Sequence, residues 1–189
     1  MSLLHGSLLA FCDTPVGTLR IVGTDNAVSR ILFPHEVLPD LPDTPPVQQS
    51  SAALDACVQQ LREYFAGQRT RFDLSLASDE SAGFHARVRE ELTRVGFGQR
   101  LTYSQLAVLA GNPRATRAAG SACARNPLPI VVPCHRIIRS DGTLGNYRGG
   151  NEAKTFLLDF EAQRSRATAP KRAALEPQFP HSSPISQDH

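Results

Sequence analysis

The amino-acid sequence predicts an α+β protein, in which a small antiparallel-sheet αβ unit precedes a mostly helical unit with a helix-turn-helix. Short apolar runs separated by turn residues lie near the N-terminus, whereas apolar residues recur at helical spacing further on. A Gly-Asn-Pro turn then separates two short helical stretches. We expect one domain over residues 1–82, a second over 83–164 and a disordered tail over 165–189.

The N-terminal unit begins with three candidate strands, at residues 8–12, 18–23 and 27–33. They are rich in Leu, Ile, Val and Phe and are separated by turn residues, which predicts an antiparallel meander. Apolar residues at helical spacing predict a helix over 52–66, ended by a glycine. A last strand near 72–76 would complete the unit.

The second unit contains the predicted helix-turn-helix. Thr102 or Ser104 can cap a short helix that runs to Leu109. Pro113 suits the first position of the next helix, which should end near Cys123.

Other segments connect or follow these elements. A stretch over 34–50 contains five prolines and predicts a loop, while 84–95 predicts a helix. The apolar run 128–133 predicts a short strand that delivers Cys134 at a fixed angle, because prolines lie near its start and at its end. A final helix is expected over 152–164.

Charge is distributed unevenly, although the net charge is only +2. Residues 1–82 carry 5 Arg and 10 acidic residues, whereas 83–150 carry 10 Arg and 3 acidic residues. Arg114 and Arg117 stand among small side chains in the second predicted helix of the helix-turn-helix. The pattern fits a surface that faces nucleic acid, and it also fits a solvated basic face on a tightly packed helix.

Composition restricts the cellular setting. The four cysteines have no CxxC spacing, the N-terminus has no signal-peptide pattern, and no apolar run reaches the length of a membrane helix. We expect a soluble, cytoplasmic protein without a membrane partner. An excess of Arg over Lys, 18 to 2, points to a bacterial source.

Cys134 and His135 form the candidate reactive pair. A buried cysteine is most often a small hydrophobic residue, and adjacent side chains on a strand point apart. A nucleophilic thiol needs a base and a group that orients the base. His135 can act as the base, directly or through one water, and Glu161 on the last helix can orient it. We expect this pair to keep the thiol partly ionised near neutral pH.

The run 126–138, with the sequence NPLPIVVPCHRII, resembles the signature of the O6-alkylguanine-DNA alkyltransferases. Further resemblance lies upstream, at 102–107 and 117–120, and downstream, at 145–150 and 157–161. More weakly, Thr14-Pro-Val-Gly17 and Tyr64-Phe-Ala-Gly67 resemble the family's N-terminal domain. The resemblance implies a ribonuclease-H-like fold for that domain.

The resemblance also implies roles for individual residues. Cys134 would accept the alkyl group, His135 and Glu161 would remove its proton through water, and Asn126 would brace the turn. Tyr103 would help to rotate the nucleotide and protonate the leaving base. Arg117 would be a finger inserted into DNA, and the other residues implied to bind DNA are Tyr103, Thr116, Ala118, Gly120 and Arg125. The residues implied to line the guanine pocket are Tyr147, Arg148, Ile137, Pro129 and Asn146.

The implied activity is once-only repair of O6-alkylguanine, and of O4-alkylthymine, in double-stranded DNA. The protein would act as a monomer from the minor groove, by base flipping, with no cofactor and no metal. Three alternatives are a non-catalytic relative that binds alkylated DNA, a Cys-His hydrolase and a helix-turn-helix transcription factor. Cys134 argues against the first alternative, the arginine-bearing helix-turn-helix against the second, and the small residues of that helix against the third.

Overall fold

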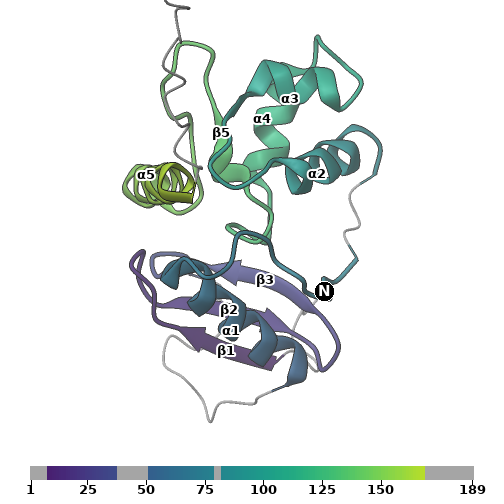
Figure 1. Cartoon of the computed structure of the whole chain (residues 1–189). Coiled ribbons are helices and arrows are strands. Elements are labelled where there is room, and N and C mark those ends of the chain that lie inside the picture. The colour runs from purple at the N-terminus through teal and green to yellow at the C-terminus, as the bar shows by residue number, and fades with distance from the viewer. Residues whose placement is uncertain (1–7, 38–50, 79–81, 169–189) are drawn as a thin grey trace, which may run out of the picture.

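A computed structural model describes residues 8–37, 51–78 and 82–168 (Figure 1). In chain order the elements are β1 Leu8–Cys12, β2 Leu19–Gly23, β3 Val28–Leu32, α1 Ala52–Ala66, α2 Phe84–Arg94, β4 Leu101–Thr102, α3 Tyr103–Leu109, α4 Thr116–Ala124, the 3-10 helix η1 Cys134–Arg136, β5 Ile137–Ile138 and α5 Gly150–Thr168. The predicted α+β class is confirmed. Most of the predicted loop over 34–50 and of the predicted tail lies outside the described residues.

Strands β1, β2 and β3 form an antiparallel sheet in that order, as the turn residues between them predict. Helix α1 lies across one face of this sheet (Figure 1). Ser51 caps α1 by accepting a hydrogen bond from Leu54 N, and Gly67 ends the helix in the left-handed conformation at φ 77°. The helix therefore has the predicted bounds.

The predicted strand over 72–76 does not form. A single parallel bridge joins Leu76 to Val28, and no longer ladder follows it in the described residues. A side chain of α1 binds this segment: Gln60 donates to the carbonyl of Asp73 at 2.6 Å and accepts from its N–H at 2.8 Å. The backbone groups of Asp73 thus have a side chain as partner, while Ser75 and Ala77 bond the backbone of Val28 in β3.

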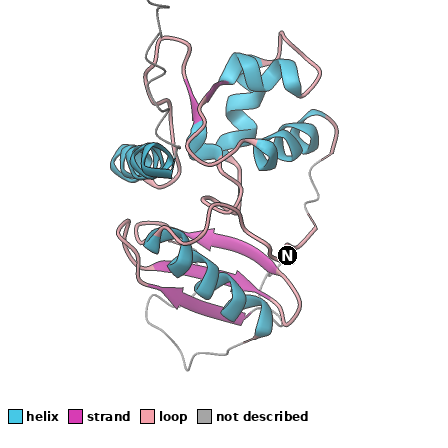
Figure 2. Cartoon of the chain, viewed as in Figure 1, coloured by secondary structure: helices cyan, strands magenta, loops and turns pink. Residues whose placement is uncertain are grey.

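Helices α3 and α4 form the predicted helix-turn-helix, beside α2 (Figure 2). Thr102 caps α3 in a reciprocal capping box with Gln105. The second helix begins at Thr116 rather than at Pro113, so that part of the prediction is wrong. The side-chain oxygen of Asn112 accepts from Arg114 N at 3.2 Å, and the backbone carbonyl of Asn112 accepts from Ala115 N at 3.0 Å. These bonds make a turn before the helix starts.

The apolar run 128–133 is also not a strand, contrary to the prediction. It forms turns, in which Val132 N donates to Leu128 O at 2.8 Å and Ile130 has a positive φ of 74°. The strand in this region is β5, two residues that pair in parallel with β4 just after Cys134–Arg136. Leu128, Ile130 and Val132 of the run are buried in the hydrophobic core.

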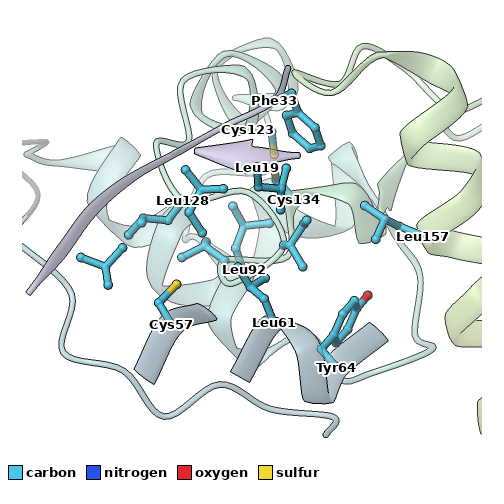
Figure 3. Packing of buried hydrophobic residues seen from close by; sticks show 14 of the residues in the cluster. Leu19, Phe33, Cys57, Leu61, Tyr64, Leu92, Cys123, Leu128, Cys134 and Leu157 are labelled. Atoms are coloured by element: carbon cyan, nitrogen blue, oxygen red, sulfur yellow. The ribbon is translucent and has the colours of Figure 1, made fainter. Parts of the chain in front are cut away.

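One hydrophobic core joins the two halves of the chain, and Figure 3 shows part of it. Leu61 and Tyr64 of α1 lie there with Leu92, Leu128 and Cys134. Helix α5 continues to Thr168, four residues past its predicted end, so the chain is still helical where the tail was expected to begin. Within the described ranges, no helix is both long and apolar enough to cross a membrane.

Candidate active site

Cys134 begins the 3-10 helix η1 directly after Pro133, and only 3% of it is exposed. Burial raises the pKa of its thiol, while the amide of Asn126 and the cations of Lys154 and Arg148 act in the opposite direction. The resting thiol is therefore protonated. This outcome contradicts the expectation of a partly ionised cysteine, and it means that a base must take the proton when the thiol reacts.

Asn126 fixes the turn that carries Cys134. Its side-chain carbonyl accepts from Leu128 N at 3.1 Å, and its amide donates to Val132 O at 2.8 Å. The same amide donates to Cys134 Sγ at 3.1 Å. Since Asn126 is itself buried, its bonds to Leu128 and Val132 fix the turn, and its amide bond to Sγ favours negative charge on the sulfur.

His135 and Glu161 form a buried pair. His135 Nε2 lies 2.9 Å from Glu161 Oε1, and the two side chains are 0% and 1% exposed. Burial lowers the pKa of His135, although Glu161 opposes the effect, so the ring is neutral. An ionised carboxylate can only accept, so Nε2 carries the ring proton. Nδ1 is buried and has no hydrogen-bond partner among the described residues, which leaves its lone pair available for a proton.

Glu161 accepts hydrogen bonds from four residues. Besides His135, they are Arg136 at 2.8 to 3.2 Å, Gly98 N at 2.9 Å and the hydroxyl of Tyr64 at 2.7 Å. Burial alone would raise the pKa of Glu161, but the bonds from His135 and Arg136 lower it to about 2. Glu161 is therefore a permanent anion that orients His135 and does not take up its proton.

Sequence reasoning missed Lys154, which the structure places beside the site. Its ammonium group donates to the carbonyl of Ile137 at 2.6 Å and to that of Leu144, and it lies 5.8 Å from the ring centre of Tyr103. Burial lowers the pKa of Lys154 to about 8. Lys154 lies four residues after Gly150, the first residue of α5, and the fold buries it completely, which no local pattern in the sequence indicates.

Three of the residues predicted to line the guanine pocket, Asn146, Tyr147 and Arg148, lie in the loop before α5. Tyr147 packs edge-on to His135, with 6.3 Å between ring centres, and its buried hydroxyl has no partner among the described residues. The carbonyl of Asn146 accepts from Tyr103 at 3.4 Å. Pro129 and Ile137 are buried, in the turn before Cys134 and in β5 respectively.

Arg148, the fifth predicted pocket residue, is held by its neighbours. Its side chain pairs with Glu36 and donates to the carbonyl of Asn126 at 3.3 Å, while its own carbonyl lies 3.0 Å from His35 Nε2. These contacts attach the pocket loop to the segment after β3. The contacts with Glu36 and Asn126 thus hold the guanidinium of Arg148 close enough to Cys134 to oppose the rise in the pKa of its thiol that burial causes.

The residues predicted to bind DNA lie on α4 and next to it. Arg117 and Arg125 are exposed, and Thr116, Ala118 and Gly120 are half-buried. Arg125 donates to Ser121 Oγ at 2.9 Å, so it is partly held against its own helix. Gly120 faces the ring of Tyr103, where a Cβ atom would lie 3.8 Å from the ring, at ordinary van der Waals distance.

Comparison with known proteins identifies the family. Residues 83–163 match the model of the 6-O-methylguanine DNA methyltransferase, DNA binding domain, and residues 8–78 match that of the ribonuclease-like domain of the same family. The chain belongs to the 6-O-methylguanine DNA methyltransferase family. Its N-terminal sheet and α1 thus belong to the ribonuclease-like domain, and its helix-turn-helix to the DNA-binding domain.

Individual methyltransferases resemble the chain over most of its length. The constitutive methylated-DNA–protein-cysteine methyltransferase of Bacillus subtilis strain 168 is 38% identical over 79% of this chain and 92% of its own. The crystal structure of the Mycobacterium tuberculosis O6-methylguanine methyltransferase matches with a TM-score of 0.73 and 32% identity, covering 84% of this chain and 94% of that one. A structure of Mycobacterium tuberculosis OGT in complex with DNA matches with a TM-score of 0.72 and 32% identity, covering 82% and 92%.

No group of three or more His, Cys, Asp or Glu side chains that could hold a metal ion occurs within residues 8–37, 51–78 and 82–168. The site is thus built from a thiol, an imidazole, a carboxylate and an amide, with a lysine beside them.

Proposed function

We propose that this methyltransferase repairs alkylated DNA by moving the alkyl group from O6 of guanine to Cys134 Sγ, once per molecule. The observation that carries the proposal is the arrangement around the thiol. Asn126 holds the sulfur at 3.1 Å, and the next residue is a neutral, buried His135 whose far nitrogen is fixed by Glu161 at 2.9 Å. The relatives' names, which describe transfer from methylated DNA to a protein cysteine, support the same reaction.

The transfer is an in-line displacement. The thiol proton passes to His135 Nδ1, directly or through one water, and the sulfur attacks the alkyl carbon. An S–C bond forms while the bond from carbon to O6 breaks, and its electron pair leaves with guanine. Tyr103 donates a proton to the leaving base, and solvent then returns a proton to Tyr103 and removes one from His135.

The groups have suitable protonation states for these steps. Burial raises the pKa of Tyr103 to about 12, so this residue holds a proton to donate. The amide of Asn126 and the cations of Lys154 and Arg148 stabilise the thiolate as it forms. The product is a thioether, which water does not hydrolyse under physiological conditions, so the molecule is consumed by the reaction.

DNA binding supplies the target base. O6 of a stacked guanine is out of reach of a buried thiol, so the nucleotide must be flipped out of the duplex. We assign the opening of the duplex to Arg117, an exposed long side chain among small residues on α4, working from the minor groove. Thr116, Ala118 and Gly120 allow the helix to approach the strands, while Tyr103 and Arg125 contact the backbone.

The flipped base enters the pocket formed by Tyr147, Asn146, Pro129, Arg148 and the backbone around Ile137. O4-alkylthymine presents the same alkyl-oxygen group and is a second substrate. The protein acts as a monomer, since every group in the scheme comes from one chain. We assign the chemistry to the C-terminal domain, from residue 83 onward.

Replacing Cys134 by serine tests this assignment. The substitution keeps the size of the side chain and removes the nucleophile, so duplex DNA with O6-methylguanine should bind with unchanged affinity and remain unrepaired. Cys123→Ser, a second buried thiol on α4, is the control and should repair normally. Full repair by Cys134→Ser would disprove the proposed acceptor.

A further inference from the structure

Tyr64 belongs to the N-terminal domain, yet its hydroxyl lies in the catalytic centre of the other domain. The residue is on α1 and is fully buried. Figure 3 shows its ring extending from α1 toward the C-terminal part of the molecule. Aromatic rings surround it, and the ring centres lie 5.1 to 5.9 Å from that of Tyr64, for Phe65, Phe72, Phe97 and Phe160.

The hydroxyl of Tyr64 donates to Glu161 Oε1 at 2.7 Å. The same oxygen accepts from His135 Nε2 at 2.9 Å. Burial, together with the neighbouring carboxylate, raises the pKa of Tyr64 well above its ordinary value, so the hydroxyl always holds its proton. Tyr64 and His135 therefore share one acceptor atom.

Sharing this oxygen affects the base. A carboxylate favours the protonated form of a histidine by the negative charge that it presents, and each further donor on the same oxygen reduces that effect. Glu161 stays in place without Tyr64, because Arg136 and Gly98 N hold both of its oxygens. Tyr64 therefore acts on His135 through Glu161, because its hydrogen bond reduces the negative charge that the carboxylate presents to the imidazole ring.

We propose that Tyr64 is a positioning residue of the alkyl-transfer site, through which the N-terminal domain sets the basicity of His135 by way of Glu161. The inference rests on the proposed role of His135 as the base. The other groups that face His135 are Arg136 and Lys154, which are cationic, the neutral Tyr147 and the acceptor Cys134. All of these lie in the C-terminal domain.

Tyr64→Phe removes the hydroxyl and keeps the ring in its aromatic surroundings. The measurement is the rate at which free O6-benzylguanine alkylates the full-length protein, followed from about pH 5 to pH 9. With one donor fewer on Glu161, His135 becomes more basic, so the acid limb of the rate profile should move to higher pH by about 0.5 unit or more. Because the free base needs no flipping, DNA binding does not enter the result.

Phe72→Leu is the matched control, since it removes a ring packed on Tyr64 and leaves the hydroxyl in place. It should lower the melting temperature without moving the acid limb. An unmoved limb in Tyr64→Phe, or equal movement in the two variants, would overturn the inference.

An NMR measurement and a Glu161→Gln variant test the role of Tyr64 further. In the unsubstituted protein, the Tyr64 hydroxyl proton should give a downfield NMR signal with a cross-peak to the Nε2 proton of His135, and its absence also overturns the inference. Glu161→Gln separates this inference from the proposed relay. If Glu161→Gln loses reactivity while Tyr64→Phe keeps the parental profile, only the role of Tyr64 fails; if Glu161→Gln reacts like the parent, the relay fails as well.

Discussion

Glu161→Gln keeps the shape of a buried side chain and removes its charge. At neutral pH the substitution leaves the buried guanidinium of Arg136 without its anion, and breaking such a pair costs about 3–5 kcal/mol. The lowered pKa of Glu161 gives a second value for this loss of folding free energy. A decrease from 4.5 to about 2 corresponds to about 3 kcal/mol of folding free energy. The two values agree, so we expect the free energy of unfolding to fall by about 3 to 4 kcal/mol at pH 7.

The effect should depend on pH in a defined direction. A carboxylate whose pKa is lowered by folding contributes its full stability above its ordinary pKa of 4.5, and this contribution is lost as the pH falls toward 2. The difference in stability between the parent and Glu161→Gln should therefore shrink between pH 4.5 and pH 2. Urea unfolding at a series of pH values measures it.

Alkyl transfer should also slow, by about 100-fold for free O6-benzylguanine, because a misoriented His135 no longer acts as a general base. Binding to duplex DNA should not change. Glu152→Gln, an exposed acidic residue in the first turn of the same helix, is the control and should match the parent in both assays. A Glu161→Gln variant as stable and as reactive as the parent would refute the reasoning.

Three further predictions concern other parts of the molecule. Arg117→Ala should slow repair of duplex DNA by about 10-fold or more, because part of the few-kcal/mol term for flipping is lost, and leave the reaction with the free base near parental; equal slowing of both would exclude the finger. Lys154→Met should remove a pH dependence of stability. Because burial lowers the pKa of Lys154 from 10.5 to about 8, the parent should become more stable relative to the variant as the pH rises from about 8 to 10.5. Urea unfolding curves that keep the same separation over this range would contradict the prediction. Deleting 169–189 should leave the melting temperature unchanged, whereas deletion from 165 should lower it, because Ser165 packs against Gly98; equal melting temperatures would show that the last turn of α5 contributes nothing.

Local signals were sufficient to predict the N-terminal sheet and α1. Ser51 and Gly67 define the two ends of α1 through hydrogen bonds within a few residues. The three strands are short apolar segments separated by turn residues, and both features can be seen in the sequence. The same holds for the start of α3, where the capping box lies within four residues. Short-range chemistry of this kind can be inferred from neighbours in the chain.

The segment that carries the nucleophile depends on contacts that the sequence does not display. An apolar run such as 128–133 has the composition of a strand, but Asn126 binds its backbone at Leu128 and Val132 and folds it into turns. Gln60 likewise binds the backbone of Asp73, in the segment that was predicted to be a strand. In both cases a single polar side chain binds the backbone of a segment whose composition is typical of a strand.

The residues proposed for catalysis were predicted from their resemblance to a family motif, as was the brace Asn126, whereas Tyr64 and Lys154 were not predicted. The pair of His135 and Glu161 spans 26 residues, and the structure brings the two together as expected. Tyr64 contacts Glu161 across 97 residues and from the other domain, so no local pattern could indicate it. The burial of Lys154 likewise results from the packing of α5 against the active-site loop.

The central claim is that Cys134 is the acceptor of a once-only transfer. Intact protein is incubated with an excess of duplex DNA containing O6-methylguanine, its mass is measured over time, and the modified peptide is sequenced. We predict a gain of one methyl group per chain, after which the reaction stops, with the methyl group on Cys134. Continued repair by the same molecules, or methylation at Cys12, Cys57 or Cys123 in place of Cys134, would contradict the account.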